Sequence, residues 1–578
     1  MTKSLVPLVL LSAIAMGCNS TSPATAKKNF SWQQQNDTPD KISCVRSDSS
    51  TPVTITADKL DMSVNDGKGC FGRDGKFCNL NIYQIMVESF VHGKNGAKGV
   101  DISWGPSDHQ GNLKGIIDNL SHIKASGVNA IWLTPIFTTT GVDGQDESFD
   151  KLDGTGYYTS DYFSVDPRFG TKEELKQLVN KAHSMGIYVF LDGVFGHAKT
   201  NVVATSPNGN KLVLNRMCRD ISGYDDKMSL KLGTCFKVDE SMDFLKEVAT
   251  YWIKEVKIDG WRLDQAYQLT GSQWNQITKA VEDESAKKSN TYTFNGKKVQ
   301  PLGFTFAEIW IEDPKVIEKD VFADKGVHGA FNFPLRYQLV EVLATREDPF
   351  ARNACSLPAK SINDEIFIKM KGYSDDAIMN NFITNHDTVR FGDLLQRSKY
   401  EVDGVKTDSY YQAHLAAISF LAATSGPLTI YYGDETADDL SGFSFKPDNC
   451  ARLNQCDDHV SRTNGHVTNL TPEEKNLQRN VAKVLKLREK HKALTNGKRV
   501  HLFSDHTLYI DLKQYNGDNV LFVLNSGSSA RDITITADVG GKLGLNSCTM
   551  KSLAGGSVNN NVITSPALSG TFIGLSCK

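Results

Sequence analysis

Short apolar runs recur along the middle of the chain at helix-length intervals, and several of them end in a polar or charged residue. One interval shows the helical pattern clearly. Thr171 and Glu174 form a capping box, apolar side chains follow at helical spacing, and Gly186 ends the helix. A continuous apolar run, 187–192, comes next. This order of helix, short loop and buried strand is half of a βαβ unit.

Eight apolar runs of this kind predict eight strands. They span residues 81–87, 128–134, 187–192, 258–264, 303–308, 326–333, 379–385 and 427–433. Eight strands separated by helix-length intervals favour a closed parallel (β/α)8 barrel over an open sheet, because a barrel brings all eight strand ends to one face. The chain is therefore predicted to be an α/β protein with a TIM barrel over residues 81–490.

Three other segments lack this alternation of strand and helix. Residues 197–240, after the third strand, are rich in Asn, Gly, Ser and Lys and predict a small inserted domain. From 497 to 578, short alternating runs and Gly-rich turns predict a C-terminal all-β sandwich domain. Residues 19–80 are polar and then rich in Gly and Cys, and they are interpreted as an N-terminal tether or extension.

The composition is that of an ordinary globular protein, with 578 residues, 40% of them hydrophobic and 23% charged. The formal net charge of −3 is close to balance, and the sequence has no long basic run. Nucleic acid and anionic membranes are therefore not favoured as partners, whereas a neutral substrate fits.

The N-terminus is predicted to be an export signal. Lys3 precedes an apolar stretch, 5–16, that is too short for a typical membrane span and is followed by Gly17 and Cys18. Small residues before a cysteine resemble a bacterial lipoprotein cleavage site. Residues 1–18 are therefore interpreted as a lipoprotein-type signal peptide, with a lipid anchor at Cys18 as the only membrane contact. The predicted location is a bacterial membrane, periplasmic or at the cell surface; a plain secretory signal and a secreted protein are the alternative.

Ten cysteines remain after Cys18, and an even number in an exported chain favours disulfides. The plausible pairs are Cys70–Cys78, Cys218–Cys235, Cys450–Cys456, Cys548–Cys577 and, by remainder, Cys44–Cys355. A zinc site is the competing interpretation. The sequence has no CxxC pair and no histidine at metal-ligand spacing from these cysteines, so disulfides are favoured.

Charged residues gather at the predicted carboxyl ends of the strands. Arg262 and Asp264 lie two apart on the fourth strand, so alternation places both towards the barrel axis. A guanidinium can hold the neighbouring carboxylate ionised, and an ionised carboxylate aimed into a pocket is a candidate nucleophile. A buried ion pair that only fixes the strand register is the alternative.

The other strand ends favour the catalytic interpretation. They carry Asp192 with His197, Glu308, and His386 with Asp387, on the third, fifth and seventh strands. Burying isolated acids without partners costs on the order of several kcal/mol. A fold that collects the three acids Asp264, Glu308 and Asp387 from the fourth, fifth and seventh strands, with an arginine and two histidines, is therefore more consistent with catalysis than with structure.

Four short segments then resemble the signatures of the α-amylase family, glycoside hydrolase family 13, in order and spacing. They are DGVFGH (192–197), GWRLDQAY (260–267), FAEIW (306–310) and FITNHD (382–387). The resemblance extends over about 81–490, and the run ATYWIKEVKIDGWRLD with the AEIW motif is similar to the neopullulanase and cyclomaltodextrinase branch.

The resemblance implies a retaining hydrolase of α-glucosidic bonds in starch-type glucans or maltooligosaccharides. It assigns Asp264 as the nucleophile, Glu308 as the general acid/base and Asp387 as the third acid. Arg262 matches the partner of the nucleophile, Asp192 a residue that orders the site, and Tyr157, His197 and His386 match contacts to the sugar at the cleavage point. Retention requires the nucleophile and the acid about 5–5.5 Å apart, with the higher pKa expected on Glu308.

Two sites depart from the family pattern. Gly196 stands where the family usually has an asparagine that often ligates a structural calcium ion. Glycine offers no side-chain oxygen, so calcium binding stays open. Tyr267 and Gln268 stand where many α-amylases carry Lys-His, which contact the leaving-group sugars.

The expected partner is an α-glucan oligosaccharide or polysaccharide. A cyclomaltodextrinase, a neopullulanase and an α-glucan glucosyltransferase remain alternatives, and linkage, chain length and oligomeric state stay open. A non-catalytic glucan-binding protein is less consistent with the sequence, because Asp264, Glu308 and Asp387 are all present.

Overall fold

The computed structural model describes residues 50–139, 147–219, 225–227, 233–345, 357–396, 400–402, 405–442, 459–545 and 548–577. The predicted signal peptide, the pair Cys450–Cys456 and the pair Cys44–Cys355 lie outside these residues. No helix in the described ranges combines the length and the apolar composition needed to cross a membrane.

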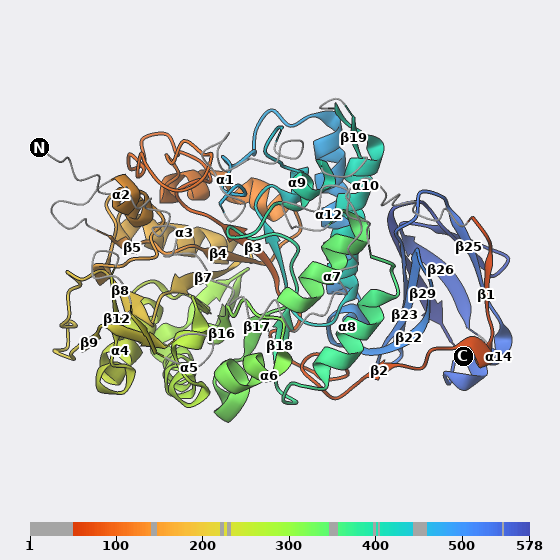
Figure 1. Ribbon diagram of the computed structural model, residues 1–578, viewed down its shortest axis with the longest axis horizontal. Helices are drawn as coiled ribbons and strands as arrows, with labels where there is room; N and C mark the ends of the chain where they lie inside the picture. Colours follow the sequence, from red (N-terminus) through yellow and green to blue (C-terminus); the bar gives the residue numbers. More distant parts are fainter. Residues whose placement is uncertain are drawn as a thin grey trace, which may run out of the picture.

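Eight parallel strands form the predicted barrel (Figure 1). In chain order they are β3 (Asn81–Ile85), β4 (Ala130–Leu133), β7 (Tyr188–Gly193), β13 (Gly260–Leu263), β16 (Phe304–Ala307), β17 (Gly329–Phe331), β18 (Ile378–Asn380) and β21 (Leu428–Tyr431). Neighbours in the chain pair with each other, β21 pairs with β3, and a parallel bridge from Asn381 to Leu428 closes the ring. Each strand falls within the run that predicted it, with two exceptions of one residue. Strand β7 ends one residue after its run, and β18 begins one residue before its run.

Helices surround the barrel because each buries an apolar face against the strands. The main ones are α1 (Leu113–Ala125), α3 (Lys172–Ser184), α4 (Val238–Val256), α5 (Gly271–Ser285), α7 (Phe333–Leu343), α8 (Ser361–Met370), α10 (Asp408–Ala423) and α12 (Pro472–Lys490). Helix α3 begins after the predicted capping box, in which Thr171 accepts from the Glu174 backbone. Gly186 follows the helix with φ +71°, which a glycine adopts without strain.

Aromatic side chains fill the interior of the barrel. Phe190, Phe304, Phe306 and Phe331 pack with Trp132 in one buried cluster. Because side chains alternate along a strand, Asp192 and Glu308 follow Phe190 and Phe306 on the same inner side. The apolar core therefore ends just below the carboxyl ends of the strands, and the charged residues lie above it.

The inserted segment after β7 carries short strands of its own. A small sheet joins β8 (His197–Ala198), β12 (Thr234–Phe236) and β9 (Leu214–Asn215), and β10 (Met217–Arg219) pairs with β11 (Asp225–Lys227). The predicted disulfide Cys218–Cys235 links this segment. The insertion begins at His197, so its first strand fixes a residue of the predicted site.

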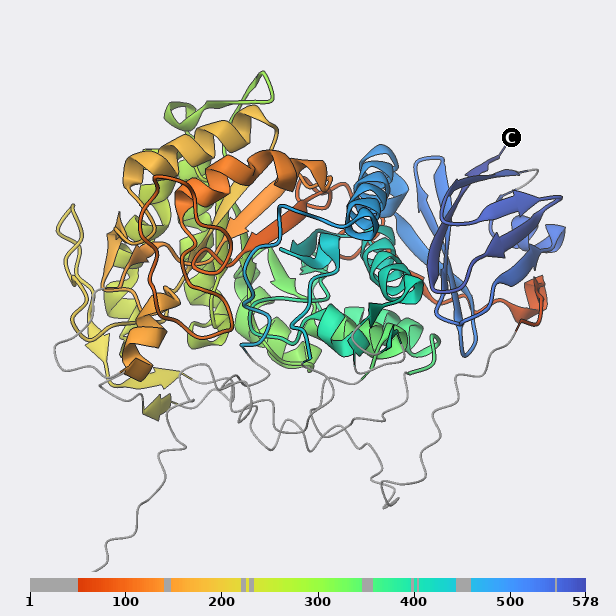
Figure 2. The same ribbon diagram turned by 90° about the horizontal axis from the view of Figure 1, so that it is seen from above.

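A two-sheet sandwich follows the barrel and lies beside α10 and α12 (Figure 2). Its strands are β22 (Lys498–Ser504), β23 (Leu508–Tyr515), β24 (Asp518–Asn525), β25 (Arg531–Ile535), β26 (Thr549–Ala554), β27 (Ser557–Asn559), β28 (Val562–Ser565) and β29 (Ser569–Ser576). The predicted disulfide Cys548–Cys577 joins the ends of β26 and β29. Helix α10 packs against the sandwich, with the rings of Phe420 and Phe522 5.9 Å apart.

The described part of the N-terminal extension differs from a free tether. Strand β1 (Val53–Ile55) pairs in parallel with β25, and β2 (Val64–Asn65) pairs antiparallel with β22. Segments from the two ends of the chain therefore build the sandwich together. These strands of two and three residues pair only through the tertiary fold, which explains why the local pattern did not reveal them.

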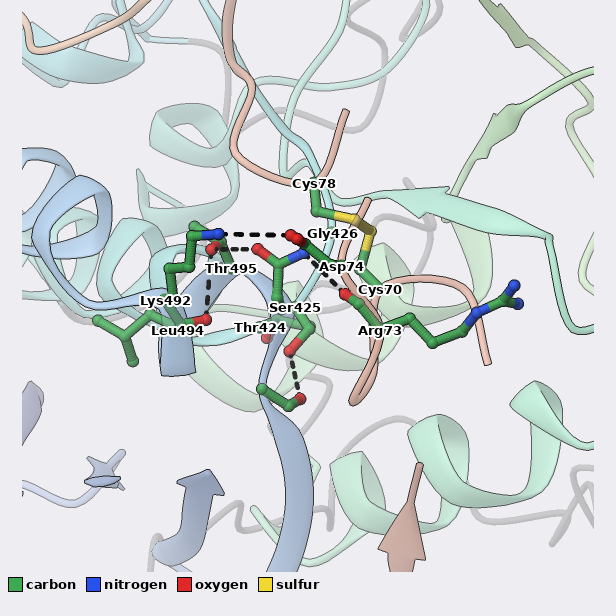
Figure 3. Close-up of a disulfide and its surroundings, with 12 residues drawn as sticks. Cys70, Arg73, Asp74, Cys78, Thr424, Ser425, Gly426, Lys492, Leu494 and Thr495 are labelled. Atoms are coloured by element: carbon green, nitrogen blue, oxygen red, sulfur yellow. Dashed lines mark hydrogen bonds and ion pairs between the residues drawn. A yellow bond between two sulfur atoms is a disulfide. The ribbon is translucent and has the colours of Figure 1, made fainter. Parts of the chain in front are cut away.

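A second part of the extension docks near the start of β21 (Figure 3). The predicted disulfide Cys70–Cys78 closes the loop, and the Arg73 carbonyl accepts a hydrogen bond from Asn496 Nδ2 at 2.8 Å. The Cys78 carbonyl accepts from the buried Arg488, 3.1 Å away. Both contacts hold the loop against residues that follow the last barrel strand, so segments from the two ends of the chain meet here as well.

Candidate active site

Backbone pairing brings four of the predicted residues to neighbouring positions. Arg262 on β13 lies in register with Asp192 on β7, and the Glu308 amide extends the ladder by donating to the Leu263 carbonyl at 2.8 Å. The Asp264 amide donates to the Gly193 carbonyl at 3.0 Å in the same way. The strand register therefore places the three acids around Arg262.

The Arg262 guanidinium is the centre of this group and is fully buried. Nη1 lies 2.8 Å from Asp192 Oδ1 and 2.9 Å from Asp264 Oδ1, and Nη2 lies 3.4 Å from Glu308 Oε2. The guanidinium also lies over the Trp132 ring, 5.0 Å from its centroid. One cation thus faces three carboxyl groups, of which Asp264 and Glu308 are the two that the sequence predicted as nucleophile and acid.

Burial dominates the titration of this pair. It raises the pKa of Asp264 to about 7 and that of Glu308 to about 7, against the opposing effect of Arg262. Both groups lose solvent to a similar extent, so burial by itself does not separate their two pKa values. The geometry still distinguishes them, since Arg262 hydrogen-bonds to Asp264 and lies farther from Glu308. Arg262 therefore favours the ionised form on Asp264 and leaves the proton on Glu308.

Asp387 completes the group from the loop after β18. Its carboxylate lies 3.0 Å from His386 Nε2 and accepts a hydrogen bond from Arg462 Nη2 at 2.8 Å. Burial disfavours its charge, but His386 and Arg462 outweigh burial and hold the pKa of Asp387 below its usual range. Asp387 is therefore ionised at neutral pH. Sequence reasoning missed Arg462, which lies in the long connection after β21.

Tyr157 and His386 form a hydrogen-bonded pair against Asp192. The Tyr157 hydroxyl lies 2.7 Å from His386 Nε2 and 2.9 Å from Asp192 Oδ2, and the two rings stack with centroids 5.3 Å apart. Gln84 Nε2 lies 2.7 Å from His386 Nδ1, and an amide nitrogen can only donate there. His386 therefore carries its proton on Nε2, which leaves the Tyr157 hydroxyl free to donate to Asp192. Burial lowers the pKa of His386 to about 4, so it is neutral.

The residues around Gly196 do not fit a calcium ion bound as the family pattern implies. A Cβ atom at Gly196 would lie 2.0 Å from Gln268 Oε1, so the Gln268 amide occupies the space that an asparagine would need. No cluster of three or more His, Cys, Asp or Glu side chains suited to a metal occurs within the described ranges. A side-chain amide therefore fills the position at which the resemblance implied a metal ligand.

Active sites of parallel barrels lie at the carboxyl ends of the strands, and a pair of carboxyl groups there is what a glycoside hydrolase requires. All eight predicted site residues lie within this region, and His197 is fixed at its edge by Gln268. The site thus combines three carboxyl groups beside an arginine with neutral hydrogen-bonding groups that suit a sugar.

The comparisons with known proteins agree with this class. A model of the α-amylase catalytic domain matches residues 84–210 and 235–465, and the chain belongs to the α-amylase family. It is 27% identical over 484 residues to a cyclomaltodextrinase of Thermoanaerobacter pseudethanolicus, covering 80% of this chain and 72% of that protein. It is 29% identical over 380 residues to the intracellular maltogenic amylase of Bacillus subtilis, covering 61% of this chain and 54% of that protein.

Solved structures show the same architecture. A crystal structure of an AmyP variant in complex with maltotriose matches with a TM-score of 0.78 and 38% identity, covering 87% of this chain and 98% of that one. AmyP in complex with maltose matches with a TM-score of 0.77 and 38% identity, covering 86% and 97%. The chain is therefore a glycoside hydrolase of the α-amylase family.

Proposed function

We propose that this enzyme hydrolyses α-glucosidic bonds with retention of configuration, through a covalent glycosyl-enzyme on Asp264. The observation that carries the proposal is Arg262, which bonds Asp264 and also contacts Glu308 on the adjacent strand. The ionised Asp264 attacks the anomeric carbon while Glu308 gives its proton to the departing oxygen. Glu308 then deprotonates the water that attacks the intermediate, which regenerates both carboxyl groups.

The remaining residues hold the sugar. The ionised Asp387 accepts hydrogen bonds from sugar hydroxyls, and Tyr157, whose ring stacks on His386, supplies an aromatic contact for the sugar. His386 and His197 are neutral groups that can hydrogen-bond hydroxyls without placing charge next to Arg262. These contacts tighten around a flattened, positively charged sugar in the transition state, where the three carboxyl groups act together.

The proposed substrates are maltooligosaccharides and related starch-type α-glucans. AmyP was solved with maltotriose and with maltose, and several curated relatives are cyclomaltodextrinases or maltogenic amylases. Action on cyclodextrins or pullulan is the second candidate, because Tyr267 and Gln268 replace the Lys-His of many α-amylases on the leaving-group side. Transfer to a second sugar differs only in the acceptor that resolves the intermediate.

Product analysis distinguishes these candidates. The enzyme is incubated with starch, maltotriose, pullulan, cyclodextrin and sucrose, and the products are separated by chromatography while NMR follows the anomer first released. We expect α-anomers of short maltooligosaccharides from the linear substrates. A β-anomer as the first product contradicts retention, and longer oligosaccharides at high maltotriose concentration reveal transfer. Asp264→Asn is the control, because it removes the nucleophile.

We also propose that the chain is exported and held to a membrane by a lipid on Cys18. The support is the order of basic, apolar and small residues before that cysteine. Expression in a bacterium with labelled palmitate tests it. Label on the wild-type protein and none on Cys18→Ala supports the anchor, whereas unlabelled protein in the medium supports the plain secretory signal.

A further inference from the structure

The side chain of Gln268 lies between His197 and Gln265, the residue that follows Asp264. Its Oε1 is 3.0 Å from His197 Nδ1, and a Cβ atom at Gly196 would lie 2.0 Å from the same oxygen and 2.6 Å from the Gln268 Cβ. Gln268 is 7% exposed and His197 is 1% exposed. Residues 196 and 268 are thus a complementary pair, in which the missing side chain at one position makes room for the amide at the other.

A second hydrogen bond fixes the direction of this amide. Gln268 Nε2 donates to Gln265 Oε1 at 3.1 Å, and the Tyr267 hydroxyl donates to the same oxygen at 3.0 Å. The Gln268 oxygen must therefore face His197, where it can only accept. His197 carries its proton on Nδ1 as a result, and its Nε2 keeps a lone pair.

The Gln268 amide also reaches the acid/base through Gln265. Gln265 directly follows Asp264 and has φ +40° and ψ +53°, a left-handed conformation that is unfavourable for a side chain of this size. In this conformation the backbone N–H of Gln265 donates to Glu308 Oε2 at 3.0 Å. The hydrogen bond from Gln268 to Gln265 therefore helps to hold the turn that contacts the acid/base.

We propose that Gln268 is a positioning residue that holds His197 on one side and the Gln265 turn on the other. Its amide occupies the space that a side chain at residue 196 would need. The proposal rests on the function proposed above, because it assumes that His197 and Glu308 act on the sugar. Gln268 hydrogen-bonds to His197 and to Gln265, so its effect on the acid/base passes through Gln265.

A double-mutant cycle tests whether Gln268 acts through His197. Maltotriose hydrolysis is measured for Gln268→Ala, His197→Ala and the double variant, each confirmed as folded by thermal unfolding. We expect Gln268→Ala to lower kcat roughly 10- to 100-fold with little change in KM, a typical effect of removing a group that orients an active-site residue. In the His197→Ala background, we expect Gln268→Ala to cause a clearly smaller loss.

Gly196→Ala tests the same contact from the other side and replaces Gln268→Ala if that variant does not fold. Its methyl group displaces the amide, so we expect a similar loss of kcat in the wild-type background and a clearly smaller loss in the His197→Ala background. Gln273→Ala is the matched control: the same substitution in the same segment removes a cap of α5 and is expected to leave kcat unchanged.

Two results would overturn the proposal. One is a Gln268→Ala enzyme with wild-type kcat, and the other is a loss that multiplies fully with that of His197→Ala. Asp264→Asn, measured in parallel, separates this outcome from failure of the proposed function. An active Asp264→Asn enzyme contradicts the catalytic assignment, whereas an inactive one with a multiplicative cycle contradicts only the role of Gln268.

Discussion

Two buried clusters of charge in this protein have opposite balances. In the sandwich, Asp511 accepts from Arg499 Nε at 2.8 Å and from Tyr509 at 2.6 Å, and it pairs with His501 and Lys513 at 2.8 and 3.0 Å. In the barrel, Arg262 faces the three carboxyl groups of Asp192, Asp264 and Glu308. One cluster surrounds an acid with cations and donors, and the other surrounds a cation with acids.

The pKa values follow this balance. Burial disfavours the charge of Asp511, but Arg499 and Lys513 outweigh burial and lower its pKa. Burial raises the pKa of Asp264 and Glu308 to about 7 because one guanidinium cannot compensate three carboxyl groups. Burial of charge alone therefore does not indicate catalysis. An excess of acids over donors does, since it leaves proton-binding groups near neutral pH.

The largest expected effect is on the catalytic side of this comparison. Asp264→Asn should lower kcat/KM by a factor on the order of 10⁴ or more, because the amide cannot attack the sugar. It should not lower stability at pH 8. Burial raises the pKa values of the Asp264–Glu308 pair, so the stability linked to the proton that the pair holds is present at low pH and lost as pH rises through about 7. Steady-state kinetics measure the loss of kcat/KM, and thermal unfolding at pH 8 measures stability. Strong destabilisation by Asp264→Asn would contradict the difference proposed between the two clusters.

The reciprocal substitution is Asp511→Asn. It leaves Arg499, His501 and Lys513 without their carboxylate, so we expect a loss of about 3–5 kcal/mol in the free energy of unfolding. Urea unfolding measures this loss. At a temperature where the variant is folded, kcat on maltotriose should equal that of the wild type. A large fall in kcat without a change in stability would show that the two clusters are not separable.

Much of the barrel side of this contrast could be predicted from the sequence, whereas the Asp511 cluster of the sandwich was not. The eight apolar runs predicted the strands, and alternation placed Arg262 and Asp264 on the inner side, where the structure has them. The partners Gln84 and Arg462 were not predictable, because each meets its histidine or acid only through a contact across more than 70 residues. The fit of Gln268 against Gly196 depends in the same way on two loops whose approach the local pattern does not contain.

Removing one hydrogen bond from the acid-rich cluster should have a smaller effect. Tyr157→Phe keeps the ring stacked on His386 but loses the hydroxyl that donates to Asp192. A hydrogen bond to a charged group contributes about 1.5–3 kcal/mol, so kcat/KM on maltotriose should fall roughly 10- to 150-fold. Tyr188→Phe, a control outside the site, should have wild-type kinetics. Equal kinetics for both variants would exclude a role for the Tyr157 hydroxyl.

The smallest expected change is in the pH dependence of kcat/KM. Glu308 must be protonated to assist the departure of a sugar, and burial raises its pKa to about 7. We expect kcat/KM on maltotriose to fall about tenfold per pH unit above about 7, as this proton is lost. With α-maltosyl fluoride, whose leaving group needs no acid, the alkaline fall should weaken. An equal fall with both substrates would assign that pKa to another group.

The most direct measurement is to trap the covalent intermediate. Glu308→Gln is incubated with α-maltosyl fluoride, which can form the glycosyl-enzyme without an acid, whereas the variant lacks the base for its hydrolysis. Mass spectrometry of the intact protein and of its peptides locates any adduct. We predict one maltosyl unit on the peptide that contains Asp264, and no adduct when Asp264→Asn is added. An adduct on another carboxyl group, or turnover without any adduct and with a β-anomer as product, would contradict the account.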